Sequence, residues 1–270
     1  MKKFYKICGL IFGLLLLIGL ILLVVFRLND NPSHDYNGKH AHYYNENKTF
    51  YVNKFDSIKL ACYRPDIRIS LKDINKFKVV VRGSHGADIK KIKTKVANNQ
   101  LTISDQPEHD YNDGYYAVDI YIPAKKAVKK ITGFCEEGDF YINSLNVPRI
   151  NLTIEDGDVL INKLTAKSLD LNSNDGDLKV NQSTFSRSSL KLNDGDVKIS
   201  DSQILNNSSV ILNDGDFSMS NAPKINYVLT NHSDDKIIFK GSYHSNHFAK
   251  KVKNKPVLKV TSMDGDILIN

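Results

Sequence analysis

The chain has little of what a catalytic domain or a disulfide-stabilised domain contains. Its 270 residues include no tryptophan, three methionines, three cysteines and seven prolines. Three cysteines without CxxC or other metal-ligand spacing exclude a disulfide framework and a zinc motif. HExxH, nucleophile-elbow and Walker-type motifs are all missing, and the histidines are scattered without a partner pattern. The sequence therefore predicts a protein that is not an enzyme and carries no cofactor other than, as one alternative, calcium.

The positive charge is unevenly distributed along the chain. The net charge is +7, but residues 136–235 hold sixteen acidic and eight basic residues, so the rest of the chain carries +15. Basic flanks suit contact with anionic lipid headgroups or anionic wall polymers and glycans. The alternative is that the lysines only keep strand edges soluble. Nucleic acid is not expected as a partner because no basic-aromatic platform is present.

One long apolar run, residues 7–26, contains no charged or strongly polar side chain. Twenty helical residues span about 30 Å, the thickness of a bilayer core. Lys2, Lys3 and Lys6 precede the run and only Arg27 follows closely, which predicts a cytoplasmic segment 1–6, a signal anchor at 7–26 and an exported remainder. A cleaved signal peptide is the alternative, but no small-x-small cleavage site follows the run. We expect a single-pass protein of the cell membrane in which residues 27–47 form a polar tether.

A short phrase of two acidic residues around a glycine dominates the second half of the chain. Its glycines are Gly138, Gly157, Gly176, Gly195, Gly215 and, after a degenerate copy at Asp234-Asp235-Lys236, Gly265. The first five are separated by 19, 19, 19 and 20 residues. A fixed period near 20 residues is typical of stacked-repeat proteins.

The residues between the glycines predict short β-strands. Apolar side chains stand two and four places after each glycine, as in Leu178 and Val180, with polar residues between them. Such a coil cannot bury its apolar side alone, so it must stack on its neighbours about 4.8 Å away. Glycine suits the corner because tight turns need positive φ. The fold class is therefore all-β, a single-chain β-solenoid with coils of 19–20 residues.

The predicted organisation has three parts beyond the tether. Residues 48–135 form a β region that caps the solenoid and leads into it, residues 136–239 form the regular repeats, and residues 240–270 form a C-terminal cap and the last strand. Cys62 and Cys135 fall in the exported part, where a disulfide could form. The spacing leaves open whether they are bridged, and it leaves the oligomeric state open.

Two columns of carboxylates are expected beside the glycine corners. Like charges about 4.8 Å apart repel by roughly 0.9 kcal/mol even in water, and calcium would turn this repulsion into attraction. The candidate calcium ligands are Asp156, Asp158, Asp175, Asp177, Asp194, Asp196, Asp214 and Asp216. The alternative is that these residues cap the turns and stay solvated. The six glycines are predicted to have a structural role in the turns.

Several short stretches resemble one family. Phe55-Asp56-Ser57-Ile58, Ile120-Tyr121-Ile122-Pro123 and Val128-Lys129-Lys130-Ile131, followed by repeated Gly-Asp-apolar-x-apolar strands, are similar to the DUF4097 family of adhesin-like bacterial envelope proteins. The resemblance covers roughly residues 50–270. It implies a β-solenoid without established catalytic residues and an association of some members with envelope stress. Aspartate on both sides of the glycine departs from the commoner Ser-Gly-Asp.

Three functions remain as hypotheses. The first is a membrane-anchored scaffold or sensor that docks onto other envelope proteins, and the second is an adhesin, with or without calcium, for surface glycans or proteins. The third is a polysaccharide-active β-helix enzyme, which would need off-period carboxylates gathered at one site. A tether of 21 residues reaches at most about 75 Å, and seven coils add about 34 Å, which favours a partner close to the membrane.

Overall fold

The computed structural model describes residues 44–84, 86–105 and 114–270. The predicted cytoplasmic segment, the signal anchor at 7–26 and residues 27–43 of the tether lie outside the described residues. Within the described part of the chain, the helical content includes no segment with the length and apolar character needed to cross a bilayer. Tyr44–Asn270 forms one compact unit.

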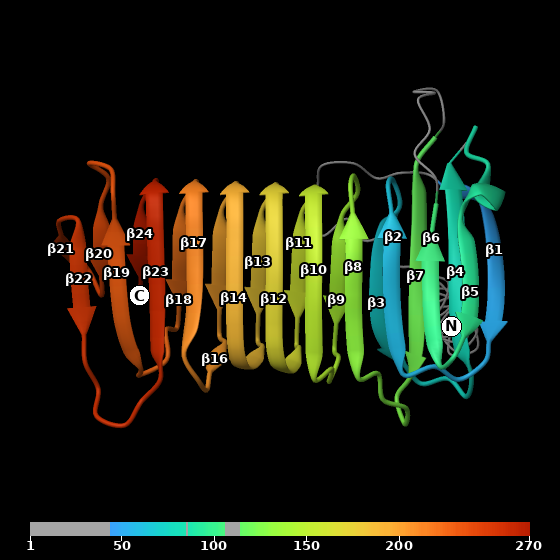
Figure 1. Cartoon of the computed structure of the whole chain (residues 1–270), viewed down its shortest axis with the longest axis horizontal. Helices are drawn as coiled ribbons and strands as arrows, with labels where there is room; N and C mark the ends of the chain where they lie inside the picture. The colour runs from blue at the N-terminus through green and yellow to red at the C-terminus, as the bar shows by residue number, and fades with distance from the viewer. Residues whose placement is uncertain (1–43, 85, 106–113) are drawn as a thin grey trace, which may run out of the picture. The chain divides into compact units, whose positions relative to one another are not determined.

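Two layers of strands make up this unit, each a sheet of twelve strands (Figure 1). In sheet A the spatial order is β1 (Tyr44–Val52), β4 (Phe77–Ser84), β7 (Tyr116–Pro123), β3 (Asp66–Lys72), β9 (Phe140–Asn143), β11 (Val159–Asn162), β13 (Leu178–Asn181), β15 (Val197–Ser200), β18 (Phe217–Ser220), β24 (Ile267–Ile269), β20 (Ile237–Phe239) and β21 (Ser242–His244). In sheet B the order is β22 (His247–Lys250), β19 (Asn226–Asn231), β23 (Val257–Asp264), β17 (Ser208–Asp214), β14 (Thr184–Asp194), β12 (Thr165–Asp175), β10 (Arg149–Asp156), β8 (Lys130–Cys135), β2 (Ser57–Cys62), β6 (Gln100–Ser104) and β5 (Lys93–Ala97), with β16 (Gln203–Ile204) beside β14. A short 3-10 helix, η1 (Ile89–Lys91), follows β4.

Each regular coil has one strand in each sheet, joined by two corners. Strands of successive coils pair in parallel and in register, so that Val159 lies beside Leu178 and Leu178 beside Val197. In Figure 1 the Asp-Gly-Asp corners form the upper edge, where β10, β12 and β14 end, and the second corners form the lower edge. The predicted all-β solenoid with coils of 19–20 residues is confirmed in this part of the chain.

The core lies between the two sheets and follows the predicted alternation. Leu178 and Val180 of β13 are buried, whereas Lys179 between them faces outward. The largest fully buried side chains include Phe55, Phe140, Phe185 and Phe217. One continuous cluster of apolar residues runs from Phe55 to Ile269, so the coils stabilise each other along the whole stack.

The second corner of each coil uses a positive φ without glycine. Ser144, Lys163, Gln182, Asp201 and Asn221 have φ between 48° and 59°. Non-glycine residues in this conformation cost about 1 kcal/mol or more, so the surrounding contacts must hold them there. Bonds between coils do so, because Lys163 N donates to the carbonyl oxygen of Asn181. The sequence pattern indicated a sharp corner here but not its conformation.

The spatial order of the last coils differs from their order in the sequence. β23 pairs with both β17 and β19, and β24 pairs with both β18 and β20. The final Asp-Gly-Asp coil is therefore inserted between the coil of β17–β18 and the coil of β19–β20. The antiparallel strands β21 and β22 then cover the outer coil. The predicted last strand thus lies inside the stack.

At the other end, residues 44–135 extend the two sheets with strands of mixed direction. β4 pairs antiparallel with β7 and β1, and β5 pairs antiparallel with β6. The strands β3 and β8 pair in parallel with β9 and β10, the first strands of the regular coils. The irregular end is therefore continuous with the solenoid. The boundaries at residues 135 and 239 stay a prediction.

The inserted coil can be tested with engineered disulfides in residues 44–270. Ser218 of β18 is in register with Leu268 of β24, which in turn is in register with Ile238 of β20. Ser218→Cys with Leu268→Cys should cross-link on oxidation, because paired residues on neighbouring strands lie within disulfide reach. Ser218→Cys with Ile238→Cys, two strands apart, should not. The two outcomes would be reversed if the coils stacked in sequence order, and non-reducing gels with peptide mapping distinguish them.

Candidate functional site: an aspartate ladder and the polar network at its end

The aspartate after each glycine forms a hydrogen bond to the next coil. Asp139 Oδ1 accepts from Asp158 N at 2.9 Å, and Asp158 Oδ1 accepts from Asp177 N at 2.9 Å. The same bond continues through Asp196, Asp216 and Asp266 and ends at Lys236 N, 2.8 Å from Asp266 Oδ1. We call this series the aspartate ladder. It satisfies one backbone donor per coil with a charged acceptor, which makes a strong hydrogen bond.

The glycines allow the coils to approach this closely. A Cβ on Gly176 would lie 2.4 Å from the carbonyl oxygen of Gly157, and Gly176 has a φ of +115°. Gly157, Gly195, Gly215 and Gly265 show equivalent distances of 2.3–2.4 Å to the preceding coil, and Gly138 would meet Pro65 at 2.9 Å. Any side chain would therefore clash with backbone. All six glycines have a positive φ and no space for a Cβ, and their structural role in the turns stays a prediction.

The two columns of carboxylates occupy different environments. The aspartates before the glycines, Asp156, Asp175, Asp194 and Asp214, are exposed. Among those after the glycines, Asp158, Asp177 and Asp196 are half-buried and Asp216 is exposed, and each gives one oxygen to the ladder. Lys198 and Lys179 contact the other oxygen of Asp196 and Asp177 at 2.8 and 3.3 Å.

These contacts explain the second aspartate of each copy without a metal. In the described part of the chain, no three His, Cys, Asp or Glu side chains gather in an arrangement that could hold a metal ion. The predicted calcium ligands are thus brought to one edge of the solenoid as two separate columns. Calcium binding stays a prediction that depends mainly on the exposed column.

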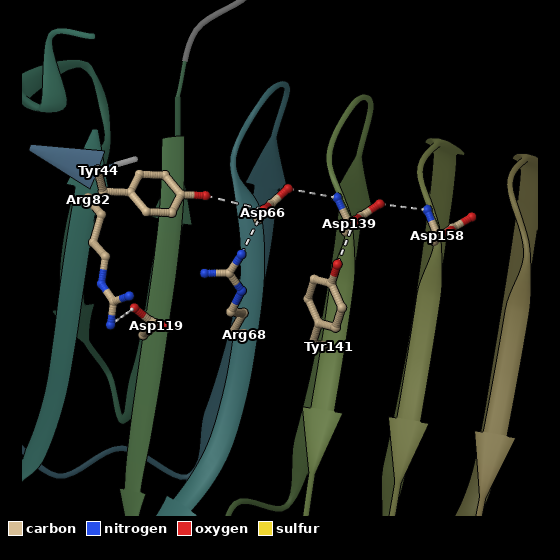
Figure 2. A network of polar contacts seen from close by, with 8 residues as sticks. All are labelled: Tyr44, Asp66, Arg68, Arg82, Asp119, Asp139, Tyr141 and Asp158. Carbon is tan, nitrogen blue, oxygen red and sulfur yellow. Dashed lines mark hydrogen bonds and ion pairs between the residues drawn. The ribbon is translucent and has the colours of Figure 1, made fainter. Parts of the chain in front are cut away.

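The ladder begins at Asp66 of β3, within a network of tyrosine and arginine side chains (Figure 2). Asp66 Oδ1 accepts from Asp139 N at 3.1 Å, while its Oδ2 accepts from Arg68 at 2.9 Å and from the Tyr44 hydroxyl at 3.5 Å. The Tyr141 hydroxyl donates to Asp139 Oδ2. The guanidinium of Arg68 lies over the rings of Tyr44 and Tyr141, at 5.9 and 5.4 Å from their centroids. This network covers the point where the irregular region joins the regular coils.

A second ion pair lies beside this network. Arg82 of β4 contacts Asp119 Oδ2 of β7 at 2.9 Å, and Asp119 is 4% exposed. Burial raises the pKa of Asp119, against the opposing charge of Arg82. Arg82 also donates to the Tyr121 hydroxyl at 3.4 Å. The sequence analysis predicted no site role for these residues, because each stands at an outward position of an ordinary alternating strand.

Burial also raises the pKa of Asp66 to about 6, although the charge of Arg68 acts in the opposite direction. This value lies above the ordinary 3.8, so the carboxyl takes up a proton on folding between these pH values. Stability from this group is therefore gained as the pH falls through 6 and is absent at higher pH. The network at the end of the ladder therefore contains a carboxyl whose charge changes near pH 6.

Cys62 and Cys135 are direct neighbours on the paired strands β2 and β8. Both are buried and free, and Cys62 Sγ donates to the carbonyl oxygen of Ile103 at 3.6 Å. A hydrogen bond with Cys135 and burial raise the pKa of the Cys62 thiol. The register places the two residues together, as a disulfide would require, and a disulfide between them stays a prediction.

The paired coils, the inward alternation and the aspartate ladder define a parallel β-solenoid extended by antiparallel strands at both ends. The chain belongs to the Toastrack DUF4097 family, whose model matches residues 55–270. The resemblance drawn from the repeat strands is thereby confirmed. No curated protein matches the chain.

Several solved structures are similar over most of the chain. A provisionally named adhesin from Bacteroides fragilis NCTC 9343 is 14% identical, with a TM-score of 0.46, over 83% of this chain and 96% of that chain. A provisionally named cell adhesion protein from Clostridium sporogenes ATCC 15579 is 15% identical, with a TM-score of 0.39, over 83% and 98%. A provisionally named lipid-binding protein from Parabacteroides distasonis ATCC 8503 is 13% identical, with a TM-score of 0.37, over 83% and 96%. These likenesses are too distant to indicate a function.

The role of Asp66 can be tested by the pH dependence of unfolding. Compared with Asp66→Asn, wild-type residues 44–270 should gain about 1.4 kcal/mol of unfolding free energy between pH 7.5 and pH 5, because only the carboxyl takes up a proton. Asp105 and Asp119, whose pKa values are also raised, are present in both proteins and cancel in the comparison. Asp175→Asn, at an exposed position, is the control and should follow wild type. A difference between wild type and Asp66→Asn that is equal at both pH values would contradict this role.

Proposed function

We propose that the protein is an adhesin-like binding and scaffold protein of the bacterial cell envelope. Residues 7–26 anchor it in the membrane, the solenoid lies on the extracytoplasmic side, and its sheet faces dock onto other envelope proteins. The family resemblance extends this proposal to a role in envelope stress. One observation carries it, namely that the polar groups of the repeat are used for bonds between coils.

The aspartate ladder and the second corners show this use of polar groups. Asn181 donates from Nδ2 to Asn162 Oδ1 at 3.0 Å and accepts from the Ser200 hydroxyl. Buried Ser183 and Ser202 bond to backbone groups of the corners. Because these residues hold the coils in register, they are part of the scaffold. Binding to other molecules would therefore use the outer faces of the two sheets.

Two flat faces dominate that surface. The outer face of sheet A carries Lys179, Lys198 and Ser218 in one row across neighbouring strands, and the outer face of sheet B carries Asp170, Ser189 and Ser209 in another. A shallow, open depression beside η1 is lined by Glu46, Lys48 and residues 86–90. Flat faces with polar side chains suit a macromolecular partner better than a small molecule.

The alternatives have less support. A polysaccharide-active enzyme would need off-period carboxylates free to act, whereas Asp66 and Asp119 are paired with Arg68 and Arg82. A calcium-dependent adhesin would depend on the exposed column of aspartates. Docking onto proteins near the membrane needs only the polar faces of the two sheets, without free carboxylates or a bound ion. It also agrees with the short reach of the predicted tether.

In-cell photo-cross-linking of the full-length chain tests this proposal. A photoreactive amino acid replaces Lys179 on the sheet A face in one variant and Lys191 on the sheet B face in another, and captured proteins are identified by mass spectrometry. We expect one face to capture a reproducible set of membrane proteins, with the chain lacking the probe as a control. Capture of nothing or of wall polymer from both faces, with residues 44–270 still binding to cell surfaces, would favour an adhesin and contradict the scaffold.

A further inference from the structure

The two long edges of the solenoid carry opposite charges. The edge formed by the Asp-Gly-Asp corners, here called the acidic edge, exposes Asp156, Asp175, Asp194, Asp214 and Asp264. The opposite edge, formed by the second corners and the loops in line with them, is here called the basic edge. The proposed function uses the faces and leaves this separation of charge unexplained.

At the N-terminal end, the basic edge is formed by three adjoining loops. Their exposed lysines are Lys54 between β1 and β2, Lys76 between β3 and β4, and Lys125, Lys126 and Lys129 between β7 and β8, together with Lys72 at the end of β3. Backbone bonds fix these loops together, since Ala124 N donates to the oxygen of Lys72 at 3.0 Å and Lys129 N to that of Asp56 at 2.7 Å. The acidic residues on these loops are Asp56, which pairs with Lys129 at 2.8 Å, and Asp73.

At the C-terminal end, the loop between β22 and β23 forms the basic edge. Its exposed lysines are Lys251, Lys253 and Lys255, next to the exposed Lys250 at the end of β22. Residues 240–256 contain no aspartate or glutamate. Asn226 Nδ2 donates to the carbonyl oxygen of Lys255, and Val257 N donates to Asn207 Oδ1 at 3.0 Å. These bonds hold the loop on the same edge as the second corners.

Two lysine-bearing loops project from the basic edge. Figure 1 shows the β7–β8 loop and the β22–β23 loop projecting below most of the corners between them. Seven strand spacings separate β8 from β22, which is about 34 Å and several Debye lengths at physiological salt. Between the two loops the second corners add Lys163 and Lys224, and the adjoining start of β12 adds Lys167, all exposed. The acidic residue of these corners is the exposed Asp201.

Apolar side chains accompany the lysines on this edge. Leu205, on the connection between β16 and β17, is 54% exposed. Val252 is half-buried among the lysines of the β22–β23 loop. Lysines beside exposed apolar side chains are typical of surfaces that sit at the headgroup level of a bilayer.

We propose that the basic edge docks onto an anionic lipid surface, with the acidic edge facing away from it. Two projecting lysine loops and Leu205 between them fit a flat surface, which both loops can contact at once. A linear anionic polymer is favoured less, since the tyrosine and arginine side chains that could stack on sugar rings, such as Tyr141 and Arg68, lie in the sheet A network. The preference for a lipid surface over a polymer rests on the proposed function, because that function keeps the solenoid near a membrane.

Vesicle binding of residues 44–270 tests this docking without the anchor. The fragment holds a continuous core of its own, so it is expected to fold alone. It should bind phosphatidylcholine vesicles that contain about 30% phosphatidylglycerol at about 50 mM salt, and bind little to pure phosphatidylcholine or at about 300 mM salt. Co-sedimentation gives the bound fraction.

Two variants with the same net charge locate the contact. Replacing Lys125, Lys126, Lys250 and Lys251 by Gln should weaken vesicle binding by about tenfold or more. Replacing Lys59, Lys93, Lys191 and Lys259 by Gln, all exposed on sheet B away from the basic edge, should weaken it by about twofold or less. Leu205→Ser should weaken binding to vesicles and leave binding to soluble polyphosphate unchanged.

Three results would overturn the docking. They are no binding to anionic vesicles at low salt, equal losses in the two lysine variants, or binding to polyphosphate but not to vesicles. Each leaves the proposed scaffold intact, because photo-cross-linking of the anchored chain is measured separately. Conversely, failure to capture envelope proteins would leave vesicle binding unaffected.

Discussion

The structure depends on the contact between glycines of successive coils. The backbone of one coil passes so near the carbonyl oxygen of the glycine before it that no Cβ fits, with Gly176 and Gly157 as the typical pair. This contact sets the coil spacing at the upper edge, where both sheets turn. It also places the following aspartate within reach of the next backbone N–H, so the aspartate ladder follows from the glycine packing. The flat faces and the two charged edges follow from the same regular spacing.

The repeat was readable from the sequence because every coil obeys the same constraint. A glycine every 19 or 20 residues, with apolar residues two and four places later, predicts the coil, its corner and its inward face. The role of the aspartate that follows each glycine could be predicted only in part. Its spacing indicated a column of carboxylates, but a hydrogen bond to the next coil and a metal site give the same spacing. Only the fold shows that Asp177 N donates to Asp158 Oδ1.

Two features lay beyond the sequence. Every coil presents the same alternation to its neighbours, so nothing in residues 257–269 marks them as a partner for both β17–β18 and β19–β20 rather than for the outer coil alone. The Asp66 network could not be predicted from the sequence for a related reason. Arg68 and Tyr141 occupy ordinary outward positions on strands that are far apart in the chain. The lysine loops were visible only as a net charge, because their alignment along one edge requires the pairing of the strands.

The central claim, that glycine packing between coils holds the solenoid together, is tested by comparing two alanine substitutions in residues 44–270. Gly176→Ala should lower the free energy of unfolding in urea by about 3 kcal/mol or more, or prevent folding, because its Cβ meets backbone of the preceding coil. Gly241→Ala, which also has a positive φ of 75° but nothing within 4 Å of its Cβ, should cost only about 1 kcal/mol. Equal losses in the two variants would contradict the account, since they would show that strain in φ, and not contact between coils, makes glycine necessary.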